Sequence, residues 1–518
     1  MVTREPSFGG LADILALHAR ERGGKAALYI PPDRTVTYGE LSDRALRFAA
    51  FLTQSGVPRG GRVAILLQNV PEFVVSYFGA IAAGCVAVPV NYRLSPPEVA
   101  YILSDASASA VVTSREQFAK VAGQEGTRSV KIWLLADGGE KGALPFDAAL
   151  AGEPASAPSP AAPDDVATLL YTSGTTGFPK GAMISHRNTL FNVASCRAAL
   201  GYREDDVGLV TLPLFHVTGL NSQLVALLAC GASLVLQKEY GTRAALELIA
   251  RYRATVLFFV PAIYKLFTLR EDAGRYDLSS VRVAAYGGAP MAPETIVAVR
   301  RILPARLHNC YGLTECSSLG TVLPSELALE RSESVGFPVP GTEGQVRGAD
   351  GAVLPAGAPG ELFLRGPHIV QGYFGAPEKS RDAIRDGWLR TGDIARIDAE
   401  GLVYILDRAK DMINRGGEKV YGLEVENVIY TCPGVAEAAV FGIPHPVFGE
   451  VPAACVVALP GETVDPEAII AHCRRRLADY KTPVSVRVVE RIPRNPGGKI
   501  LKMELRKEWE SRMPGGDR

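Results

Sequence analysis

Short apolar segments alternate with longer amphipathic stretches along most of the chain. Apolar runs rich in Val, Ile and Leu, bounded by Gly, Pro or polar residues, are typical of strands buried in an α/β core. The predicted strands of this kind are Arg62–Leu67, Val86–Val90, Ala110–Thr113, Ile132–Leu135, Leu209–Leu212, Ser233–Leu236, Val256–Val260 and Val281–Ala285. Their alternation with helical stretches predicts βα layers around largely buried sheets.

Two uncharged stretches, Phe73–Tyr92 and Gly208–Gln237, are long enough to cross a bilayer. Glycines and a proline interrupt the first, which predicts a short buried helix that stops at Gly84 and a strand over Cys85–Val90. The second contains a proline and several polar side chains before its final strand. We therefore expect a soluble α/β core and no membrane span.

The later part of the chain has a different pattern. Residues 332–406 are rich in Gly and Pro and contain short strands such as Gly360–Arg365 and Leu402–Leu406, which predicts a small β-rich subdomain. After the charged run 407–411 an α+β pattern restarts. The elements predicted there are a helix near Leu423–Tyr430, strands near Glu437–Phe441 and Ala453–Leu459, and a helix over Pro466–Tyr480.

These patterns predict an α/β protein with two domains. A large N-terminal domain of layered βα subdomains and the β-rich subdomain takes residues 1–409, and a small α+β C-terminal domain takes residues 410–518. The boundary is placed at Lys410. The Pro/Ala/Ser-rich segment Gly152–Asp164 is predicted to be a surface loop.

Composition narrows the function classes. The 518 residues are 47% hydrophobic, and 55 basic residues balance 55 acidic ones. Zero net charge argues against a generally basic nucleic-acid-binding surface. The eight cysteines are scattered without a CxxC pair, and the N-terminus lacks the apolar core of a secretory signal. A cytoplasmic protein with reduced thiols is therefore expected.

The strongest chemical signal is the segment 171–181, YTSGTTGFPKG, which follows the apolar strand Val166–Leu170 and precedes a helix expected near Ser185. Glycines let backbone N–H groups approach phosphate, hydroxyls add donors, and a lysine supplies charge for a triphosphate. The spacing is not that of a Walker A loop. A flexible polar turn is the structural alternative. The residues predicted to bind ATP here are Thr172, Ser173, Gly174, Thr175, Thr176, Gly177 and Lys180.

This segment resembles the phosphate-binding signature of the adenylate-forming superfamily of acyl-CoA synthetases, luciferases and peptide-synthetase adenylation domains. The family's other motifs recur in order over nearly the whole chain. The segments Asp407–Ile413 and Ile492–Lys502 look most like bacterial fatty-acyl-CoA synthetases. The resemblance implies ATP, Mg²⁺ and coenzyme A as small-molecule partners.

Two motifs correspond to the family's acyl pocket. The sequence LPLFHV over 212–217 resembles the aromatic-His motif, in which His216 would meet a carboxylate and close its tunnel. Alone, such a histidine is more often part of the core. The turn GGAP over 287–290 follows a predicted strand and in the family lines the acyl and adenine sites. The acyl pocket implied by the resemblance comprises His216, Val217, Gly219, Gly287, Gly288, Gly312 and Leu313.

Two further motifs supply acidic groups. YGLTE over 311–315 places Glu315 as a hard oxygen ligand for Mg²⁺, with Thr176 as its partner in the family, and Thr314 near the α-phosphate. WLRTGD over 388–393 places Asp393 on the ribose hydroxyls. A surface charge and a structural salt bridge are the respective alternatives. The remaining implied nucleotide contacts are Gly288, Ala289, Asn309, Tyr311, Gly312, Thr314 and Arg408.

The last motif, PRNPGGKI over 493–500, projects Lys499 from a loop of prolines and glycines. In the family this lysine enters the active site during adenylation, where a cation offsets repulsion between the carboxylate and the α-phosphate. Lys499, His216 and Thr314 are the implied catalytic residues. The C-terminal domain is implied to be a mobile lid that rotates about Lys410, with Gly416, Gly417 and Glu418 lining the coenzyme A tunnel.

The expected reaction activates a small carboxylic acid as acyl-AMP and then transfers the acyl group to a thiol. The stretch after His216 is apolar and lacks a cationic side chain, which favours a monocarboxylic fatty, alicyclic or aryl acid over malonate. Three alternatives remain open: a ligase that loads a carrier-protein phosphopantetheine, a luciferase-like oxygenase, and a nucleotide- or acyl-binding module without turnover.

Overall fold

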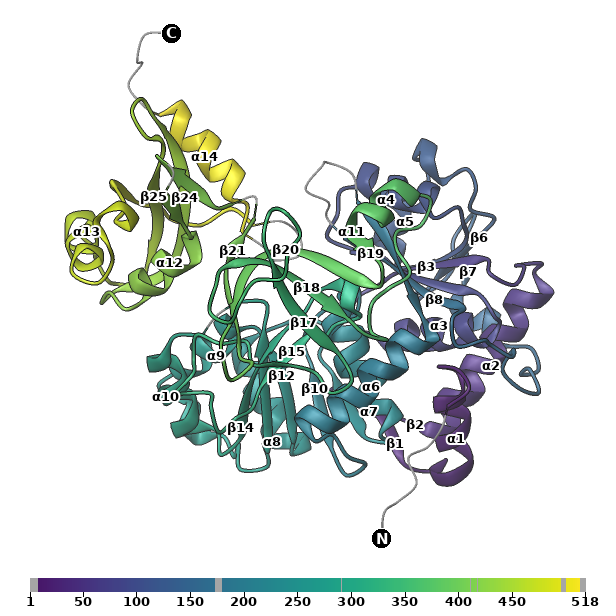
Figure 1. Ribbon diagram of the computed structural model, residues 1–518. Helices are drawn as coiled ribbons and strands as arrows, with labels where there is room; N and C mark the ends of the chain where they lie inside the picture. The colour runs from purple at the N-terminus through teal and green to yellow at the C-terminus, as the bar shows by residue number, and fades with distance from the viewer. Residues whose placement is uncertain are drawn as a thin grey trace.

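The computed structural model describes residues 8–172, 179–289, 291–409, 411–416, 418–494 and 500–512. A large N-terminal part carries three sheets, and a small C-terminal domain carries a fourth (Figure 1). This arrangement confirms the predicted fold class. No helix in the described ranges is long and apolar enough to span a membrane.

The first sheet has the spatial order β7-β6-β5-β3-β4-β8-β9 and is parallel except for its last pair. Its strands are β3 (Arg62–Leu66), β4 (Val86–Pro89), β5 (Ala108–Thr113), β6 (Ile132–Leu135), β7 (Leu144–Pro145), β8 (Val166–Thr172) and β9 (Lys180–Ser185). The helices of this region are α2 (Tyr38–Gln54), α3 (Pro71–Ala82), α4 (Pro96–Asp105) and α5 (Arg115–Val121). The expected helix, glycine stop and strand are confirmed, since α3 ends before Gly84, which has a φ of +72°.

The second sheet has the order β16-β15-β14-β13-β12-β10-β11-β1-β2. Its strands are β1 (Ala26–Ile30), β2 (Arg34–Thr37), β10 (Val207–Val210), β11 (Ser233–Leu236), β12 (Val256–Phe259), β13 (Val283–Gly287), β14 (Arg306–Tyr311), β15 (Thr321–Leu323) and β16 (Phe337–Pro338). The helices are α1 (Asp13–Arg22), α6 (His186–Leu200), α7 (Ala226–Ala229), α8 (Thr242–Tyr252), α9 (Pro261–Thr268) and α10 (Pro293–Ile302), and a π-helix spans Thr218–Val225. One apolar core joins this sheet to the first, because strand residues of both belong to the same buried cluster.

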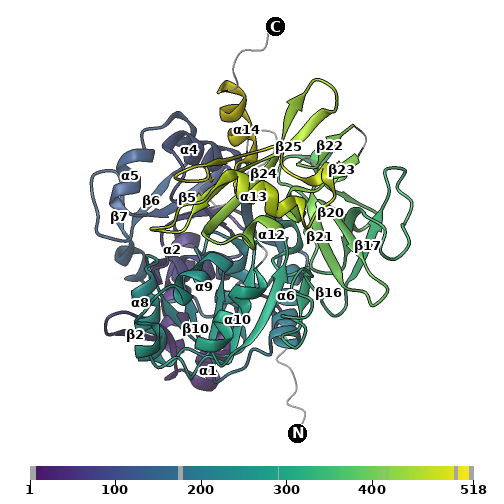
Figure 2. The same ribbon diagram turned by 90° about the vertical axis from the view of Figure 1, so that its left-hand side faces the viewer.

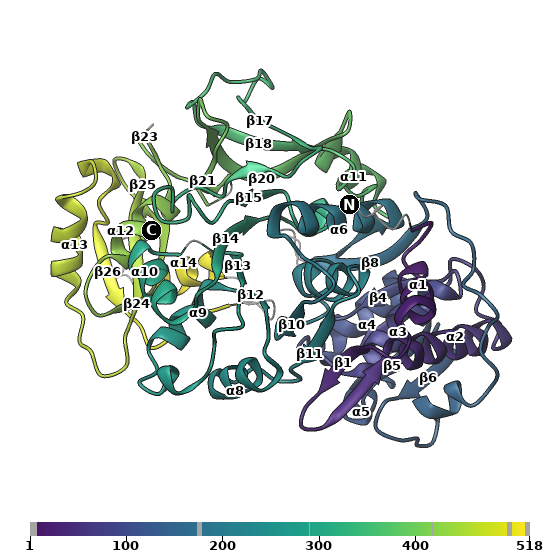
Figure 3. The ribbon, with the colours of Figure 1, turned by 90° about the horizontal axis from the view of Figure 1, so that it is seen from below.

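A third, antiparallel sheet covers one side of these layers (Figure 3). Its strands are β17 (Glu343–Arg347), β18 (Gly360–Arg365), β19 (Ile384–Arg385), β20 (Trp388–Ile397) and β21 (Val403–Arg408), with α11 (Pro377–Ala383) beside it. The β-rich subdomain predicted for residues 332–406 corresponds to this sheet.

The C-terminal domain stands in front of the other layers in Figure 2. It is built from β22 (Ile413–Arg415), β23 (Glu418–Val420), β24 (Val435–His445), β25 (Gly449–Ala458) and β26 (Ser485–Val488), with α12 (Gly422–Tyr430), α13 (Pro466–Arg474) and α14 (Lys502–Ser511). It has its own apolar core between the sheet, α12 and α13.

Three sequence predictions need correction. The helix expected over Pro466–Tyr480 ends at Arg474, because the chain turns back there and packs Leu477 and Tyr480 on the domain core. The strand expected at Leu209–Leu212 is β10, two residues earlier. Lys180 begins strand β9 instead of lying in a loop that leads directly to a helix.

Candidate active site

The predicted phosphate-binding segment is held at both ends by a hairpin of the first sheet. Thr172 at the end of β8 pairs with Lys180 at the start of β9. The predicted site residues between them, Ser173, Gly174, Thr175, Thr176 and Gly177, lie outside the described residues. After β9 the chain enters α6, whose first turn is closed by a capping box between Ser185 and Asn188. The pairing of Thr172 with Lys180 therefore fixes the two ends of the segment, and the capping box fixes the start of α6.

Tyr373, which belongs to none of the sequence motifs, contacts both Lys180 and Glu315. The ammonium group of Lys180 lies 5.2 Å from the ring centre of Tyr373. The hydroxyl of Tyr373 donates a hydrogen bond of 2.7 Å to Oε1 of Glu315. Tyr373 also forms a β-bridge with Ala182 of β9. One tyrosine thus contacts both the predicted phosphate-binding lysine and the predicted metal ligand.

The segment that follows β14 is folded tightly back on itself. The backbone N–H of Gly320 donates to the carbonyl of Tyr311, and that of Ser318 donates to the carbonyl of Leu313. A Cβ atom at Gly312 would lie 1.5 Å from the carbonyl oxygen of Ser318, so only glycine fits this fold-back. Thr314 and Glu315 lie at the turn of the segment in a short 3₁₀-helix.

Asp393 of β20 contacts Tyr311, the residue of β14 from which this segment starts. It is 1% exposed, its Oδ2 accepts a hydrogen bond of 2.5 Å from the hydroxyl of Tyr311, and its Oδ1 lies 2.7 Å from Nε of Arg408. Asp393 and Arg408 are direct partners in the β20–β21 ladder. Burial and the neighbouring carboxylate raise the pKa of Tyr311 well above its usual value, so the hydroxyl remains a donor. The structural salt bridge considered as an alternative is present, within a carboxylate–tyrosine–arginine cluster.

His216 lies in an aromatic environment on the side of the second sheet. Its ring is 4.5 Å from that of Phe215, which in turn contacts Tyr92. Burial, with a smaller contribution from Arg93, lowers the pKa of His216 to about 4. The imidazole is therefore neutral at pH 7 and can offer a hydrogen bond to a carboxylate without carrying a charge.

The glycine turn after β13 packs directly against β14. Gly287 pairs with Cys310, and a Cβ atom at Gly287 would lie 2.4 Å from the carbonyl oxygen of Cys310. Gly288 has a φ of +81° with open space around its Cα, and Ala289 is exposed. Asn309 is buried, and its amide donates to the carbonyl of Ser334 at 2.9 Å. The glycine turn is thus accessible, whereas Asn309 supports the chain near the site.

The acyl-pocket residues after His216 lie at the start of the π-helix. Val217 precedes the π-helix, and a Cβ atom at Gly219 would lie 2.5 Å from the carbonyl oxygen of Pro213. The strands β8, β10, β13 and β14 all lead into this region at their carboxyl ends, where ligands bind in open parallel sheets.

Part of the predicted thiol-transfer machinery is described. Gly416 has a φ of +60° and donates its N–H to the carbonyl of Phe448 at 2.8 Å, while Glu418 begins β23 and is exposed. Lys410, Gly417 and Lys499 lie outside the described residues. The described residues on either side of Lys499, Arg494 and Ile500, form a β-bridge with each other.

A buried charge cluster joins the last strand of the third sheet to the C-terminal domain. Asp407 accepts from the N–H of Gly422 in α12, and Lys502 of α14 lies 2.7 Å from Glu426. Burial raises the pKa of Asp407 to about 6, although Lys502 opposes this shift. In the sequence, Asp407 precedes the predicted hinge residue Lys410 by three positions.

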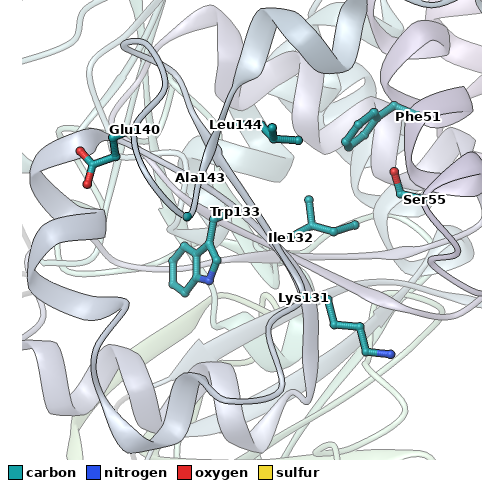
Figure 4. A pocket seen from close by; sticks show the side chains of 9 residues that line it. Phe51, Ser55, Lys131, Ile132, Trp133, Glu140, Ala143 and Leu144 are labelled. Carbon is teal, nitrogen blue, oxygen red and sulfur yellow. The ribbon is translucent and has the colours of Figure 1, made fainter.

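Other features of the described residues lie apart from this region. A shallow hollow of about 350 Å³ is lined by Phe51, Ile132, Trp133 and Leu144 (Figure 4). Strands β6 and β7, which border it, are at the opposite edge of the first sheet from β8 and β9. In the described ranges, no three His, Cys, Asp or Glu side chains form a metal site, and all eight cysteines are free.

Comparison with known proteins identifies the family. Residues 15–374 match the model of the AMP-binding enzymes, and residues 424–499 match that of the AMP-binding enzyme C-terminal domain. The chain is 37% identical over 476 residues to a feruloyl-CoA synthase of an Amycolatopsis species, covering 92% of this chain and 94% of the relative. It is 38% identical over 492 residues to a long-chain-fatty-acid–CoA ligase of Mycobacterium tuberculosis, covering 94% and 96%.

The fold matches a solved structure over nearly the full length. An anthranilate CoA ligase in complex with anthranoyl-AMP superposes with a TM-score of 0.91 at 28% identity, covering 97% of this chain and 98% of the other. The resemblance noted for the motifs of the sequence is therefore confirmed over both domains.

Proposed function

Because the chain belongs to the AMP-binding enzyme family and is an enzyme of the AMP-forming acid–CoA ligases, we propose that it converts a monocarboxylic acid and ATP into acyl-AMP and pyrophosphate. It then transfers the acyl group to coenzyme A. The observation that carries this proposal is a pair of tyrosine contacts. Tyr311, the last residue of β14, joins the Asp393–Arg408 pair, and Tyr373 links Lys180 to Glu315 in the segment that follows.

In the first half-reaction a carboxylate oxygen attacks the α-phosphorus, and the bond to the bridging oxygen of pyrophosphate breaks. Asp393 and Arg408 would hold the ribose, Lys180 and the 173–177 segment the phosphates, and Thr314 the α-phosphate. Glu315 and Thr176 would hold Mg²⁺, which supplies positive charge against the phosphates. This chain needs to position the reactants and stabilise charge without forming a covalent bond to substrate.

Lys499 would place its ammonium group between the carboxylate and the α-phosphate. This cation offsets the repulsion between two anions as they approach. A neutral His216 can donate to a carboxylate oxygen from the acyl side without neutralising the nucleophile. In the second half-reaction a thiolate attacks the acyl carbonyl, and the carbon–oxygen bond to AMP breaks. The segment Gly416–Glu418 would line the path of the thiol arm, after rotation about Lys410.

The acid is proposed to be fatty, alicyclic or aryl. The buried stretch after His216 contains Leu220, Leu224 and Leu227, each at most 1% exposed, and none of its side chains is cationic. Relatives named for ferulic acid, long-chain fatty acids and anthranilate support this range.

The test is exchange of labelled pyrophosphate into ATP across a panel of fatty, alicyclic, aryl and dicarboxylic acids. We expect acid-dependent exchange with a monocarboxylate, followed by thioester formation when free coenzyme A is added. Exchange with malonate alone would contradict the proposed acid class. Exchange without a coenzyme A thioester would favour a carrier protein as acceptor, and absence of exchange with every acid would favour a binding module.

A further inference from the structure

Three polar side chains are buried in the π-helix that follows the aromatic-His motif. Asn221, Ser222 and Gln223 are at most 1% exposed, and the residues that flank them, Leu220, Leu224 and Val225, are apolar and fully buried. Burying polar groups costs free energy unless they are hydrogen-bonded, so their partners indicate what the burial achieves. A π-helical turn is itself uncommon and is found frequently at functional sites.

The partners of two of these side chains lie on the segment after β14. The amide of Asn221 donates to the carbonyl of Ser317 at 3.1 Å, and the hydroxyl of Ser222 donates to that of Ser318 at 2.7 Å. From α6, Asn192 accepts the backbone N–H of Leu319 at 3.2 Å. We call Asn192, Asn221 and Ser222 the polar clamp. It contacts three consecutive residues of one segment.

The clamped residues have an unfavourable backbone conformation. Ser317 has a φ of +55° and Ser318 a φ of +116°, although neither is glycine. Such conformations are strained for residues other than glycine and persist only where the surroundings enforce them. Both residues are buried. They directly follow the 3₁₀-helix Thr314–Cys316, so the position of Ser317 and Ser318 determines where Thr314 and Glu315 lie.

We propose that the polar clamp positions Thr314 and Glu315 for Mg·ATP, and that Ser222 and Ser318 are positioning residues for adenylation. The clamp joins the two halves of the site, because the π-helix begins two residues after His216 and the clamped segment carries Glu315. This inference rests on the proposed function for the identity of the nucleotide. It assigns a positioning role to residues that are not among the proposed contacts of ATP or of the acid.

The test compares Ser222→Ala, Ser318→Ala and the double variant with the matched control Ser195→Ala. Ser195 is also buried, and its hydroxyl donates at 3.0 Å to the carbonyl of Phe191 in its own helix α6. Binding of the α,β-methylene analogue of ATP is measured by calorimetry over a range of Mg²⁺ concentrations. The analogue does not turn over, so the readout is independent of the acid.

We expect each single clamp variant to bind the magnesium analogue about three- to tenfold more weakly than wild type, the range that one buried hydrogen bond supports. The double variant should bind like Ser222→Ala, because that substitution already removes the hydrogen bond to Ser318, together with contacts of 3.4 Å between Ser222 and Asn192. Ser195→Ala should bind like wild type, whatever its melting temperature.

Two outcomes would overturn the inference. Clamp variants that bind the analogue like wild type, while wild type binds it, would show that the clamp only packs the core. Additive losses in the double variant would show that the two hydroxyls act independently. Failure of wild type itself to bind the magnesium analogue would instead contradict the proposed function.

Discussion

The hydroxyl of Tyr311 donates a hydrogen bond of 2.5 Å to Oδ2 of Asp393, joining the end of β14 to the third sheet. Arg408 lies against the other carboxylate oxygen, and the N–H of Asp393 donates to the hydroxyl of Thr391. The carboxylate is therefore fixed before a ligand arrives. A pre-oriented acceptor lowers the ordering cost of binding the ribose hydroxyls.

Asp393→Asn should raise the KM for ATP in pyrophosphate exchange by about ten- to a hundredfold, because the amide cannot accept with both ends and loses the charge that Arg408 faces. Tyr311→Phe removes one neutral donor and should cost about tenfold or less. Glu361→Gln is the matched control, since Glu361 pairs with Arg390 on the same sheet at 2.8 Å. An unchanged KM for ATP in Asp393→Asn would remove Asp393 from the nucleotide site.

Tyr373→Phe should raise the Mg²⁺ concentration needed for half-maximal adenylation by about three- to tenfold, because Glu315 loses the donor that fixes its carboxylate. The ring remains beneath Lys180, so the KM for ATP at saturating Mg²⁺ should change less. Tyr404→Phe is the control, since it removes another tyrosine–carboxylate hydrogen bond, that of Tyr404 to Asp398 at 3.2 Å in the third sheet. An identical Mg²⁺ response in both variants would refute a role for Tyr373 at the metal ligand.

Lys499→Ala should lower acyl-AMP formation by at least about a hundredfold, the loss expected when one preorganised charge that stabilises the transition state is removed. Thioester formation from supplied acyl-AMP should be largely retained, because the proposed mechanism uses this lysine only in the first half-reaction. Lys507→Ala, an exposed lysine of α14, should leave both rates unchanged. Equal losses in both half-reactions for Lys499→Ala would count against this division of labour.

Acidification should destabilise the protein through two buried histidines. Burial lowers the pKa values of His308 and His368 to about 4, so both are neutral in the folded state at pH 6, whereas the unfolded chain binds protons near pH 6.5. Above pH 6.5 both states leave these histidines neutral, so they do not reduce the free energy of unfolding. As the pH falls toward 4, the unfolded chain binds protons that the folded chain does not, and the free energy of unfolding decreases by up to about 3 kcal/mol per histidine.

The effect can be measured at His368, which is fully buried. Its ring stacks on that of Phe191, with 5.9 Å between the two ring centres. In His368→Phe the melting temperature should fall less between about pH 7 and pH 5 than in wild type. A fall as steep as that of wild type would show that His368 does not contribute to the acid sensitivity.

Lys502→Met should destabilise the protein by about 3–5 kcal/mol, because it leaves the buried carboxylates of Glu426 and Asp407 without their cation. Lys502→Arg keeps the charge and should lose much less. Thermal unfolding of both variants checks the prediction. Equal melting temperatures for Lys502→Met and wild type would show that this buried charge cluster does not stabilise the protein.

The apolar pattern of the sequence predicted the fold class. The motifs singled out Glu315 and Asp393 for the candidate site, because each motif concentrates unusual residues within a few positions. Tyr373 was missed, since it lies 58 residues from its partner Glu315 and meets it only through the bridge to β9. The π-helix was missed because the apolar stretch Gly208–Gln237 carries no periodic signal that separates a π-helix from an α-helix or strand. The hydrogen bonds of Asn221 and Ser222 to Ser317 and Ser318 become visible only in the folded chain.

The most direct test of acyl-AMP formation follows one oxygen atom. A preferred acid labelled with ¹⁸O in its carboxylate is converted with ATP and coenzyme A, and the products are analysed by mass spectrometry. If a carboxylate oxygen attacks the α-phosphorus and the thiolate then cleaves the carbon–oxygen bond, each AMP carries one ¹⁸O atom and pyrophosphate carries none. Label in inorganic phosphate or pyrophosphate, or unlabelled AMP alongside the thioester, would contradict the account.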